Sequence, residues 1–503
     1  MTAPVLNYAL LAPILIILGG ALVGVLVEAF IGKALRSTLQ LPIALASVVL
    51  SFAALWVSHN NPSTKAAIGS VSIDPAGIYI QGIILILAFI GILLIADQDN
   101  FTAQASALPG SDEEAAAIAS GKQQTEVFPL TLFAIAGALL FPVATDLITL
   151  FVALEVLSLP LYLMAGLSRR RRLLSQEAAL KYFILGAFSS AIFLFGTAFL
   201  YGYTGALSFN EIAAAVGGNG SNSVFLYIGI IFVSVGLLFK VGAVPFHSWT
   251  PDVYQCAPTP ITGFMAACTK VAAFGATLRL FYVALDGASQ TWKPIITAIA
   301  MITMLIGSIA AMTQRDVKRA LAYSSIAHAG FLLIGVVALS KEGLAASLFY
   351  FIAYGLATLG AFAIITMVRD SSGEVTDLNR WAGLSKKSPL VAALFTLYLL
   401  SFGGVPLTAG FIGKFSIFAA AYQGGNMLIV VVAALASAIA LFFYLRIVLM
   451  LWFSEPTNDS VTVVIPSVLT RFAIIVTAIA TIVLGIAPSL VLNSANHFAT
   501  FLH

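Results

Sequence analysis

The chain has 503 residues, of which 60% are hydrophobic and only 9% are charged. A soluble domain carries about 25% charged residues, so this composition excludes a water-soluble protein and indicates one that crosses the lipid bilayer several times. The net charge of +3 is too small and too dispersed to indicate a nucleic-acid partner, and two cysteines, Cys256 and Cys268, exclude a disulfide scaffold and lie at no metal-binding spacing.

Runs of about 20 mostly apolar residues predict about fourteen transmembrane helices. In chain order they are 8–31, 39–58, 76–96, 126–144, 146–168, 179–203, 223–245, 258–284, 291–313, 318–339, 343–368, 388–422, 427–453 and 467–492. The N-terminus, MTAPVLNY, lacks the basic region of a cleaved signal peptide, so we expect the first run to be retained as a membrane anchor. The expected fold is an all-α, polytopic membrane protein without a soluble domain.

Two of the predicted spans are expected to be broken near their middle. The segment 388–422 is too long for one straight span and contains Gly404 and Pro406, while the segment 223–245 ends in the sequence GAVP. Glycine and proline at membrane depth free backbone carbonyls, which must then find polar partners or line a wet cavity. These two breaks therefore predict a polar site inside the bilayer.

The basic residues predict the orientation of the chain. Of the 24 lysines and arginines, 17 lie in or beside the loops that follow odd-numbered spans, and 3 lie in the loops that follow even-numbered spans. Because basic loops stay in the cytoplasm, both termini are predicted on the outer side of a bacterial cell membrane. The run at 169–172 is read as a determinant of this topology, and the long polar loop at 97–125 is expected to be mobile or weakly helical on the cytoplasmic side.

A weak internal repeat accompanies the two breaks. Gly-x-Val-Pro at 242–245 returns as Gly-Val-Pro at 404–406, each time in a broken span with a lysine in its apolar sequence. These are spans seven and twelve, so they run in opposite directions, which is the pattern of inverted transport repeats. The predicted units are three helices with a cytoplasmic loop (1–125), two inverted five-helix repeats (126–290 and 291–453) and one C-terminal helix (454–503).

Four ionisable side chains lie in the middle of apolar spans: Glu155, Lys240, Lys270 and Lys414. A charged group near the bilayer centre costs roughly 2.5–3.5 kcal/mol on insertion scales, so we expect these groups to have a function. The simplest charge to move along lysine and glutamate side chains is a proton. Glu155 and Lys240 form a candidate pair of opposite charges, with a static ion pair that holds two helices together as the alternative.

Lys270 has no obvious acidic partner in the sequence, which suits a proton relay. The alternative is an amine that is bonded to carbonyls of the broken helix. His328, in YSSIAHAG, could bridge Lys270 and Lys414 with the help of water and the neighbouring hydroxyls, or could be a hydrogen-bonded core histidine. Lys414 follows the second break and is the counterpart of the buried lysines in the first repeat.

Other charged residues have simpler interpretations. Glu177 and Lys181 are spaced i, i+4, as in a charge pair at a helix start, with a proton entry site as the alternative. Arg279 and Arg446 are predicted to extend toward the outer and inner membrane surfaces. Pro142 is expected to kink the fourth span, with no role assigned to the kink.

These segments resemble one family. FKVGAVPFHSWTPDVYQCAPTPITGFMAACTKVAAFG, residues 239–275, is similar to the hallmark stretch of the antiporter-like subunits of respiratory complex I, and TPDVYQ-x-AP-x-P resembles the N type. The L and M types and Mrp-type antiporters usually have a histidine motif there and HAAT-like residues further on, where this chain has Val253-Tyr254 and ACTK at 267–270. LEVLSLPLYLMAG, QEAALKYFILGAFSSA, DVKRALAYSSIAHAG and GVPLTAGFIGKF extend the resemblance over about 126–453.

The resemblance implies a proton-translocating subunit of a proton-pumping NADH:quinone oxidoreductase, assembled with other membrane-arm subunits. It implies that Glu155 and Lys240 are the regulated pair, that Lys270 is the central relay and that Lys414 leads outward. Redox chemistry would belong to other subunits, because this sequence has no dinucleotide fingerprint, iron–sulfur cysteine set or haem motif, so no cofactor is expected in this chain. The alternatives are a membrane subunit of an Mrp-type cation/proton antiporter or an energy-converting hydrogenase, and a scaffold that transports nothing.

Overall fold

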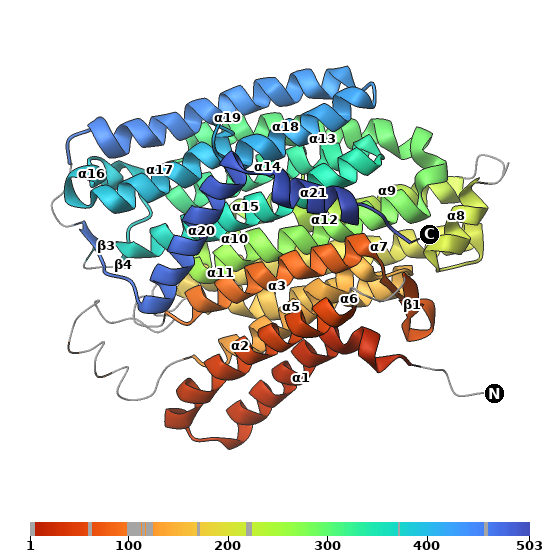
Figure 1. Ribbon diagram of the computed structural model, residues 1–503, viewed down its shortest axis with the longest axis horizontal. Helices are drawn as coiled ribbons and strands as arrows, with labels where there is room; N and C mark the ends of the chain where they lie inside the picture. The colour runs from red at the N-terminus through yellow and green to blue at the C-terminus, as the bar shows by residue number, and fades with distance from the viewer. Residues whose placement is uncertain are drawn as a thin grey trace.

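The computed structural model describes residues 6–58, 63–97, 112, 116, 124–167, 172–217, 224–370, 373–456 and 461–502. Long helices lie side by side along the long axis of the molecule, from α1 and α2 at the bottom of Figure 1 to α19 at the top. The predicted loop at 97–125 and the arginine run at 169–172 lie almost wholly outside the described residues.

The long apolar helices follow the hydropathy of the sequence. They are α1 (Tyr8–Phe30), α2 (Lys33–Ser58), α3 (Pro75–Ile95), α5 (Val127–Leu140), α6 (Leu147–Ala165), α7 (Arg172–Thr204), α9 (Val224–Val241), α13 (Ser289–Thr313), α14 (Val317–Ala338), α15 (Lys341–Met367), α17 (Pro389–Gly403), α18 (Ala409–Gln423), α19 (Met427–Phe453) and α20 (Val468–Ile486). One further apolar segment, Thr259–Ala284, contains the two shorter helices α11 (Thr259–Phe264) and α12 (Lys270–Arg279). The short helices are α8 (Phe209–Gly217), α10 (Trp249–Cys256), α16 (Leu384–Lys387) and α21 (Ser489–Phe498).

Within the described part of the chain, twelve helical segments are long and apolar enough to cross a membrane, and two shorter apolar helices, 127–143 and 389–403, accompany them. The prediction of about fourteen spans in an all-α, multi-pass membrane protein is therefore confirmed. Three boundaries differ clearly. The helix predicted at 39–58 begins at Lys33, and the one predicted at 179–203 begins at Arg172. The predicted span 467–492 ends at Ile486, and the chain continues after Pro488 as the separate helix α21. Proline at this point cannot continue the backbone ladder of α20.

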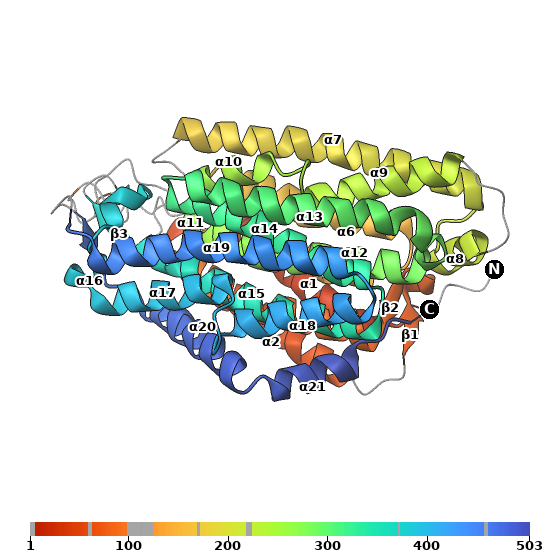
Figure 2. The same cartoon turned by 90° about the horizontal axis from the view of Figure 1, so that it is seen from above.

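The helices form an enclosed core and a lipid-facing shell. The segment Thr259–Ala284, α14 and α15 are almost wholly surrounded by other helices. Figure 2 shows α7 along one edge of the bundle and α20 and α21 along the other, with α14 and α15 between them. The outer helices expose large apolar side chains, including Trp56, Phe188, Phe195, Phe442 and Phe472. Such exposure would cause aggregation in water but is what a bilayer requires.

Two small sheets lie at opposite ends of the bundle (Figure 1). In one, β1 (Thr64–Ala66) pairs antiparallel with β2 (Val71–Ile73), with Thr64 opposite Ile73. In the other, β3 (Val368–Asp370) lies between β4 (Gly373–Glu374) and β5 (Thr462–Val463). We call the end with β3 the basic end, because the charged side chains Arg319, Arg380, Lys386 and Arg446 make their contacts there. The start of α1 and the last described residues lie at the opposite end (Figure 1).

The two predicted breaks are confirmed and share one backbone device. Gly242, just after α9, and Gly404, just after α17, have φ angles of 74° and 77°, in the left-handed region that favours glycine. Space is also limited at both positions. A Cβ at Gly242 would lie 2.9 Å from Thr250 Oγ1, and a Cβ at Gly404 would lie 2.9 Å from Lys414 Cδ. Each break therefore needs glycine for two reasons. Its φ angle is positive, and a Cβ would lie too close to a neighbouring side chain.

The segment after the first break has a feature that hydropathy does not predict. Between α11 and α12 the chain forms the π-helical turn η3 (Met265–Thr269), and after α12 it forms a second one, η4 (Leu280–Ala284). A π-helical turn inserts one residue into the helical ladder, and such turns are frequent at functional sites. Here the first of them ends directly before Lys270.

Replacement of Gly404 by alanine tests the second break. The left-handed backbone costs a residue with a Cβ about 1–2 kcal/mol, and the added methyl group would also push on the Lys414 side chain. We expect a lower midpoint of thermal unfolding for the purified protein in detergent. Gly19→Ala in α1 is the control, because nothing lies within 4 Å of its added Cβ. Equal midpoints for Gly404→Ala and the wild type would contradict this account.

Candidate functional site

The last turn of α9 carries Lys240 into the core. Its Nζ donates hydrogen bonds to Ser158 Oγ at 2.7 Å and to Tyr182 Oη at 3.4 Å. Ser158 lies three residues after Glu155, so both are on one face of α6. Glu155 in turn accepts a hydrogen bond from Ser190 Oγ on α7. Glu155 and Lys240 form no ion pair within 4.0 Å, and each is bonded to a serine hydroxyl instead.

Aromatic rings fix the helix that follows the break. The ring of Trp249, the first residue of α10, stacks on Tyr182 with centroids 4.6 Å apart and planes 9° apart. Its Nε1 donates to the Phe239 carbonyl at 3.0 Å. Because Tyr182 also holds Lys240, the position of α10 and the environment of the amine depend on the same contacts.

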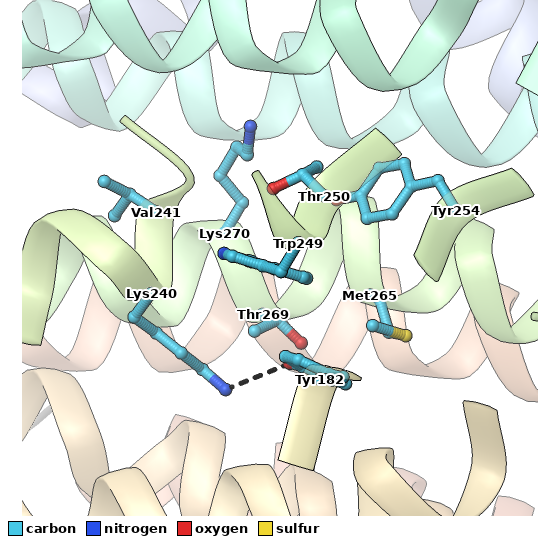
Figure 3. Close-up of a pocket in the computed structure, with 9 residues that line it drawn as sticks. All are labelled: Tyr182, Lys240, Val241, Trp249, Thr250, Tyr254, Met265, Thr269 and Lys270. Carbon is cyan, nitrogen blue, oxygen red and sulfur yellow. Dashed lines mark hydrogen bonds between the residues drawn. The ribbon is translucent and has the colours of Figure 1, made fainter. Parts of the chain in front are cut away.

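A small cavity lies between Lys240 and Lys270. Figure 3 shows the two side chains on either side of Trp249, with their amino groups pointing away from each other. The cavity volume is about 10 Å³, close to the minimum that holds one water molecule. The Thr250 and Thr269 hydroxyls line it, and both are buried with no hydrogen-bond partner among the described residues. The site can thus take one small hydrogen-bonding guest.

Lys270 is held by the neighbouring helix α14. Its Nζ donates to both the carbonyl and the Oγ of Ser325, and it lies 5.7 Å from the centroid of the Tyr354 ring. Tyr354 Oη donates to the same Ser325 Oγ at 3.0 Å. The amine is therefore bonded to a carbonyl, as the alternative interpretation expected, but that carbonyl belongs to α14 and not to the broken helix.

His328 lies three residues after Ser325 on α14. Its Nδ1 is 2.7 Å from Tyr350 Oη, and its ring centroid is 4.8 Å from that of Tyr354. Its ring centroid also lies 5.9 Å from that of Phe331, which contacts the Lys414 amine, while Tyr354 contacts the Lys270 amine. The histidine is thus placed between the two lysines, and it is also a hydrogen-bonded core residue.

The second break supplies the ligands of Lys414. Its Nζ donates to the Gly403 carbonyl at 3.2 Å and to Ser437 Oγ on α19 at 3.0 Å, and it lies 4.6 Å from the centroid of the Phe331 ring. Gly403 is the last residue of α17, so the break frees its carbonyl for the amine.

We call Glu155, Lys240, Lys270, His328 and Lys414 the buried row, in which the three lysines and the histidine are buried and Glu155 is partly exposed. Each lysine of the row is 4% exposed. Among the described residues, no carboxylate oxygen lies within 4.0 Å of any of the three amines. The structure therefore brings all five predicted site residues together through hydroxyls, one carbonyl at a break and a small cavity.

The prediction for Arg279 was wrong. The side chain does not reach the membrane surface but is fully buried and forms a bidentate ion pair with Asp74, with nitrogen–oxygen distances of 2.7 and 2.8 Å. A buried arginine is stable only when its charge is matched and its donors are satisfied, and Asp74 does both. The Pro142 carbonyl accepts from Arg279 Nε, which gives the kink in the fourth span a role. Asp74 was missed because its only signal in the sequence is its position before Pro75 at a helix start.

At the basic end the pair Glu177–Lys181 is confirmed, at 2.8 Å, but it belongs to a larger network. Lys181 also contacts Asp252 on α10 at 3.1 Å, and Arg319 on α14 contacts the same carboxylate at 2.8 Å. Partial burial of Asp252 acts to raise its pKa, but the hydrogen bonds and charges of Arg319 and Lys181 hold the pKa below its usual range. The network ties α10, and with it Trp249, to α7 and α14.

No group of three or more His, Cys, Asp or Glu side chains in the described ranges has an arrangement that could hold a metal ion. The polar groups of the interior described above are amines, hydroxyls, backbone carbonyls, carboxylates, one imidazole and the guanidinium group of Arg279.

Known proteins share both this fold and these segments. The profile of the family described as NADH:quinone oxidoreductase/Mrp antiporter, TM matches residues 144–440. The NADH-quinone oxidoreductase subunit N of Rhodococcus opacus is 51% identical over 524 residues, which cover 99% of this chain and 97% of that protein. A chain of respiratory complex I from Thermus thermophilus with bound aureothin matches with a TM-score of 0.78 and 31% identity, over 96% of this chain and 98% of that one.

A chain of the Mrp complex from Dietzia sp. DQ12-45-1b has a TM-score of 0.79 at 22% identity, over 98% of this chain and 97% of that one, and shares the fold. The protein is thus a member of the NADH:quinone oxidoreductase/Mrp antiporter transmembrane class. With 51% identity over 99% of its length to a subunit N, the chain belongs to the family of NADH-quinone oxidoreductase subunit N.

Replacement of Asp252 by asparagine tests the network at the basic end. Because its members are partly exposed, we expect a loss of about 1 kcal/mol or less at neutral pH. The contribution of a carboxylate with a depressed pKa is lost as the pH falls through that pKa, so the wild type and the variant should converge in acid. The measurement is thermal unfolding between about pH 7 and pH 2, because the pKa of Asp252 lies below the usual value of a carboxyl group. Lys386→Gln, which removes the exposed pair with Glu455, is the control, and a gap independent of pH would contradict the assignment.

Proposed function

We propose that this chain is the proton-translocating subunit N in the membrane arm of a proton-pumping NADH:quinone oxidoreductase. The observation that carries this proposal is the buried row, in which three enclosed amines are bonded to neutral acceptors. A proton can leave such an amine without the breaking of a closed ion pair. Membership of the subunit N family supports the assignment to this enzyme complex.

The proposed proton route runs along the buried row from Glu155 to Lys414. Glu155 and Lys240 form the regulated pair, and a change in the field along the membrane arm alters their interaction. Lys240 then passes a proton across the cavity to Lys270, where the Thr250 and Thr269 hydroxyls orient the guest. From Lys270 the proton passes by way of His328 to Lys414. Release to the outer side follows from Lys414.

The arrangement in the membrane completes the proposal. Because basic loops stay in the cytoplasm, the basic end faces the cytoplasm of a bacterial cell, and both termini are on the outer side. Residues 126–290 and 291–453 form the two inverted five-helix repeats, preceded by three helices and the loop of 1–125 and followed by the last helix in 454–503. The partners are the other membrane-arm subunits. This chain binds no redox cofactor, and electron transfer takes place in other subunits of the enzyme.

Two rival functions have less support. The similarity to the Mrp complex, at 22% identity, concerns the fold alone, whereas the similarity to subunit N extends over nearly the whole chain at 51% identity. A scaffold without transport would have no use for three enclosed amines, each of which costs free energy to insert.

Lys270→Ala tests the relay directly. We expect normal assembly of the complex, slower coupled turnover and at least about a tenfold lower rate of proton translocation, because the route loses its central acceptor. The measurement is NADH-driven acidification of vesicles that contain the purified complex. Lys293→Ala, outside the buried row, is the control. An assembled Lys270→Ala complex that pumps with full stoichiometry would support the scaffold instead.

Thr269→Val tests the cavity between Lys240 and Lys270. Valine has nearly the same shape as threonine but cannot hold a hydrogen-bonding guest, so we expect proton translocation to slow by about fivefold, or about 1 kcal/mol of barrier. Thr277→Val is the matched control on the same helix, because the Thr277 hydroxyl bonds the Ala273 carbonyl of its own helix. Equal effects of the two substitutions on NADH-driven pumping would remove the cavity from the route.

A further inference from the structure

The buried carboxylate of Asp74 has an unusually complete set of donors. Its Oδ1 accepts from Gly77 N and from Arg279 Nη2, both at 2.8 Å. Its Oδ2 accepts from Arg279 Nη1 and Ser72 Oγ, each at 2.7 Å, and from Leu502 N at 2.9 Å. Burial acts to raise the pKa of Asp74, but the charge and hydrogen bonds of Arg279, together with Leu502 and Ser72, hold that pKa below its usual range. Five donors fill the roughly four lone-pair sites of a carboxylate, so no site is left for a proton.

The guanidinium group of Arg279 is enclosed in the same way. Two of its nitrogens bind Asp74, and its Nε donates to the Pro142 carbonyl. The ring of Phe501, near the C-terminus, lies 4.6 Å from the guanidinium carbon. A guanidinium group does not lose its proton in proteins, so Arg279 cannot act as a relay. Neither member of the pair can therefore both accept and release a proton.

The pair lies on the direct line from Lys270 to the end opposite the basic end. Arg279 follows Lys270 by nine residues on α12, or roughly 13 Å at 1.5 Å per residue. The side chains of α12 between them are buried and apolar except for Thr277, whose hydroxyl is bonded to the Ala273 carbonyl.

Beyond the pair, the opposite end of the protein is hollowed. A surface pocket of about 310 Å³ is lined by Tyr282, Asp286, Lys341 and Phe501, among others. Phe501 thus contacts the pocket on one side and Arg279 on the other. The distance that separates the pocket from Lys270 is spanned by Phe501, the ion pair and the apolar turns of α12.

We propose that Asp74, Arg279 and Phe501 form an outer seal that keeps the proton on Lys270 from leaving directly to the outer side. This inference rests on the proposed function, because it assumes that Lys270 carries a proton. With this exit closed, the proton on Lys270 leaves laterally, through His328 toward Lys414. The contacts of the seal also tie residues 500–502 to the start of α3 and to the end of α12.

Arg279→Lys is the sharpest test, because lysine keeps the positive charge but can release a proton. The assembled complex would be placed in vesicles without NADH, and passive proton flux would be measured with a pH-sensitive dye under an imposed potassium gradient with valinomycin. We expect at least about a tenfold increase in passive flux, with NADH oxidation retained. Addition of Lys270→Ala should abolish the leak.

A second variant keeps the test decisive if Arg279→Lys does not assemble. Asp74→Asn combined with Arg279→Gln removes both charges together and so avoids an unpaired buried charge, and it too should leak. Asp286→Asn, in the pocket outside the seal, is the matched control and should not. Passive flux equal to that of the wild type in both seal variants would overturn the seal, as would a leak that persists without Lys270. Failure of the relay itself would appear separately, as full pumping by the single variant Lys270→Ala.

Discussion

The interior of this protein depends on how each buried ammonium group is solvated. An amine in a medium without water needs acceptors, and a carboxylate would hold it in a closed ion pair. The fold supplies neutral acceptors in place of carboxylates: Ser158 for Lys240, Ser325 for Lys270, and Ser437 with the Gly403 carbonyl for Lys414. These acceptors lie on helices that neighbour the ones that carry the lysines, so the packing of the helices determines which acceptors each amine contacts.

The irregular backbone follows from the same requirement. The last carbonyls of a helix have no backbone partner within that helix, so the end of α17 leaves the Gly403 carbonyl free for Lys414. Gly404 supplies the left-handed turn that ends α17, and Gly242 does the same after α9. The first break also reorients the chain so that Thr250, on α10, reaches the cavity beside Lys270. Gly242 at the first break is buried, whereas the second break continues into the exposed residues Pro406 and Leu407.

The sequence predicted the features of this structure that depend on residues close together in the chain. Span length is set by the bilayer, so hydropathy located the helices, and the Gly and Pro residues at 242–245 and 404–406 located the breaks. It did not predict partners far apart in the chain. Asp74 and Arg279 are 205 positions apart, and a buried arginine and one that extends to the surface have the same hydropathy. The serines that hold Lys240 and Lys414 were also missed, because serine is common in membrane helices, and Ser325 was expected only among the hydroxyls that neighbour His328. The π-helical turn before Lys270 has no composition that marks it.

The two kinds of buried charge differ in whether they can exchange a proton, and this difference sets the direction of proton movement in the proposed function. The Asp74–Arg279 pair is closed: each charge meets its opposite, and every lone pair of the carboxylate is occupied. Lys270, nine residues away on the same helix, has hydroxyl and carbonyl oxygens but no counter-charge within ion-pair distance among the described residues. A closed ion pair resists a change of protonation, whereas an amine that is hydrogen-bonded only to neutral acceptors can gain or lose a proton. In the proposed function, α12 therefore carries one group that can transfer a proton, Lys270, and one that cannot, Arg279. A proton that arrives at Lys270 moves across the bundle and not along α12.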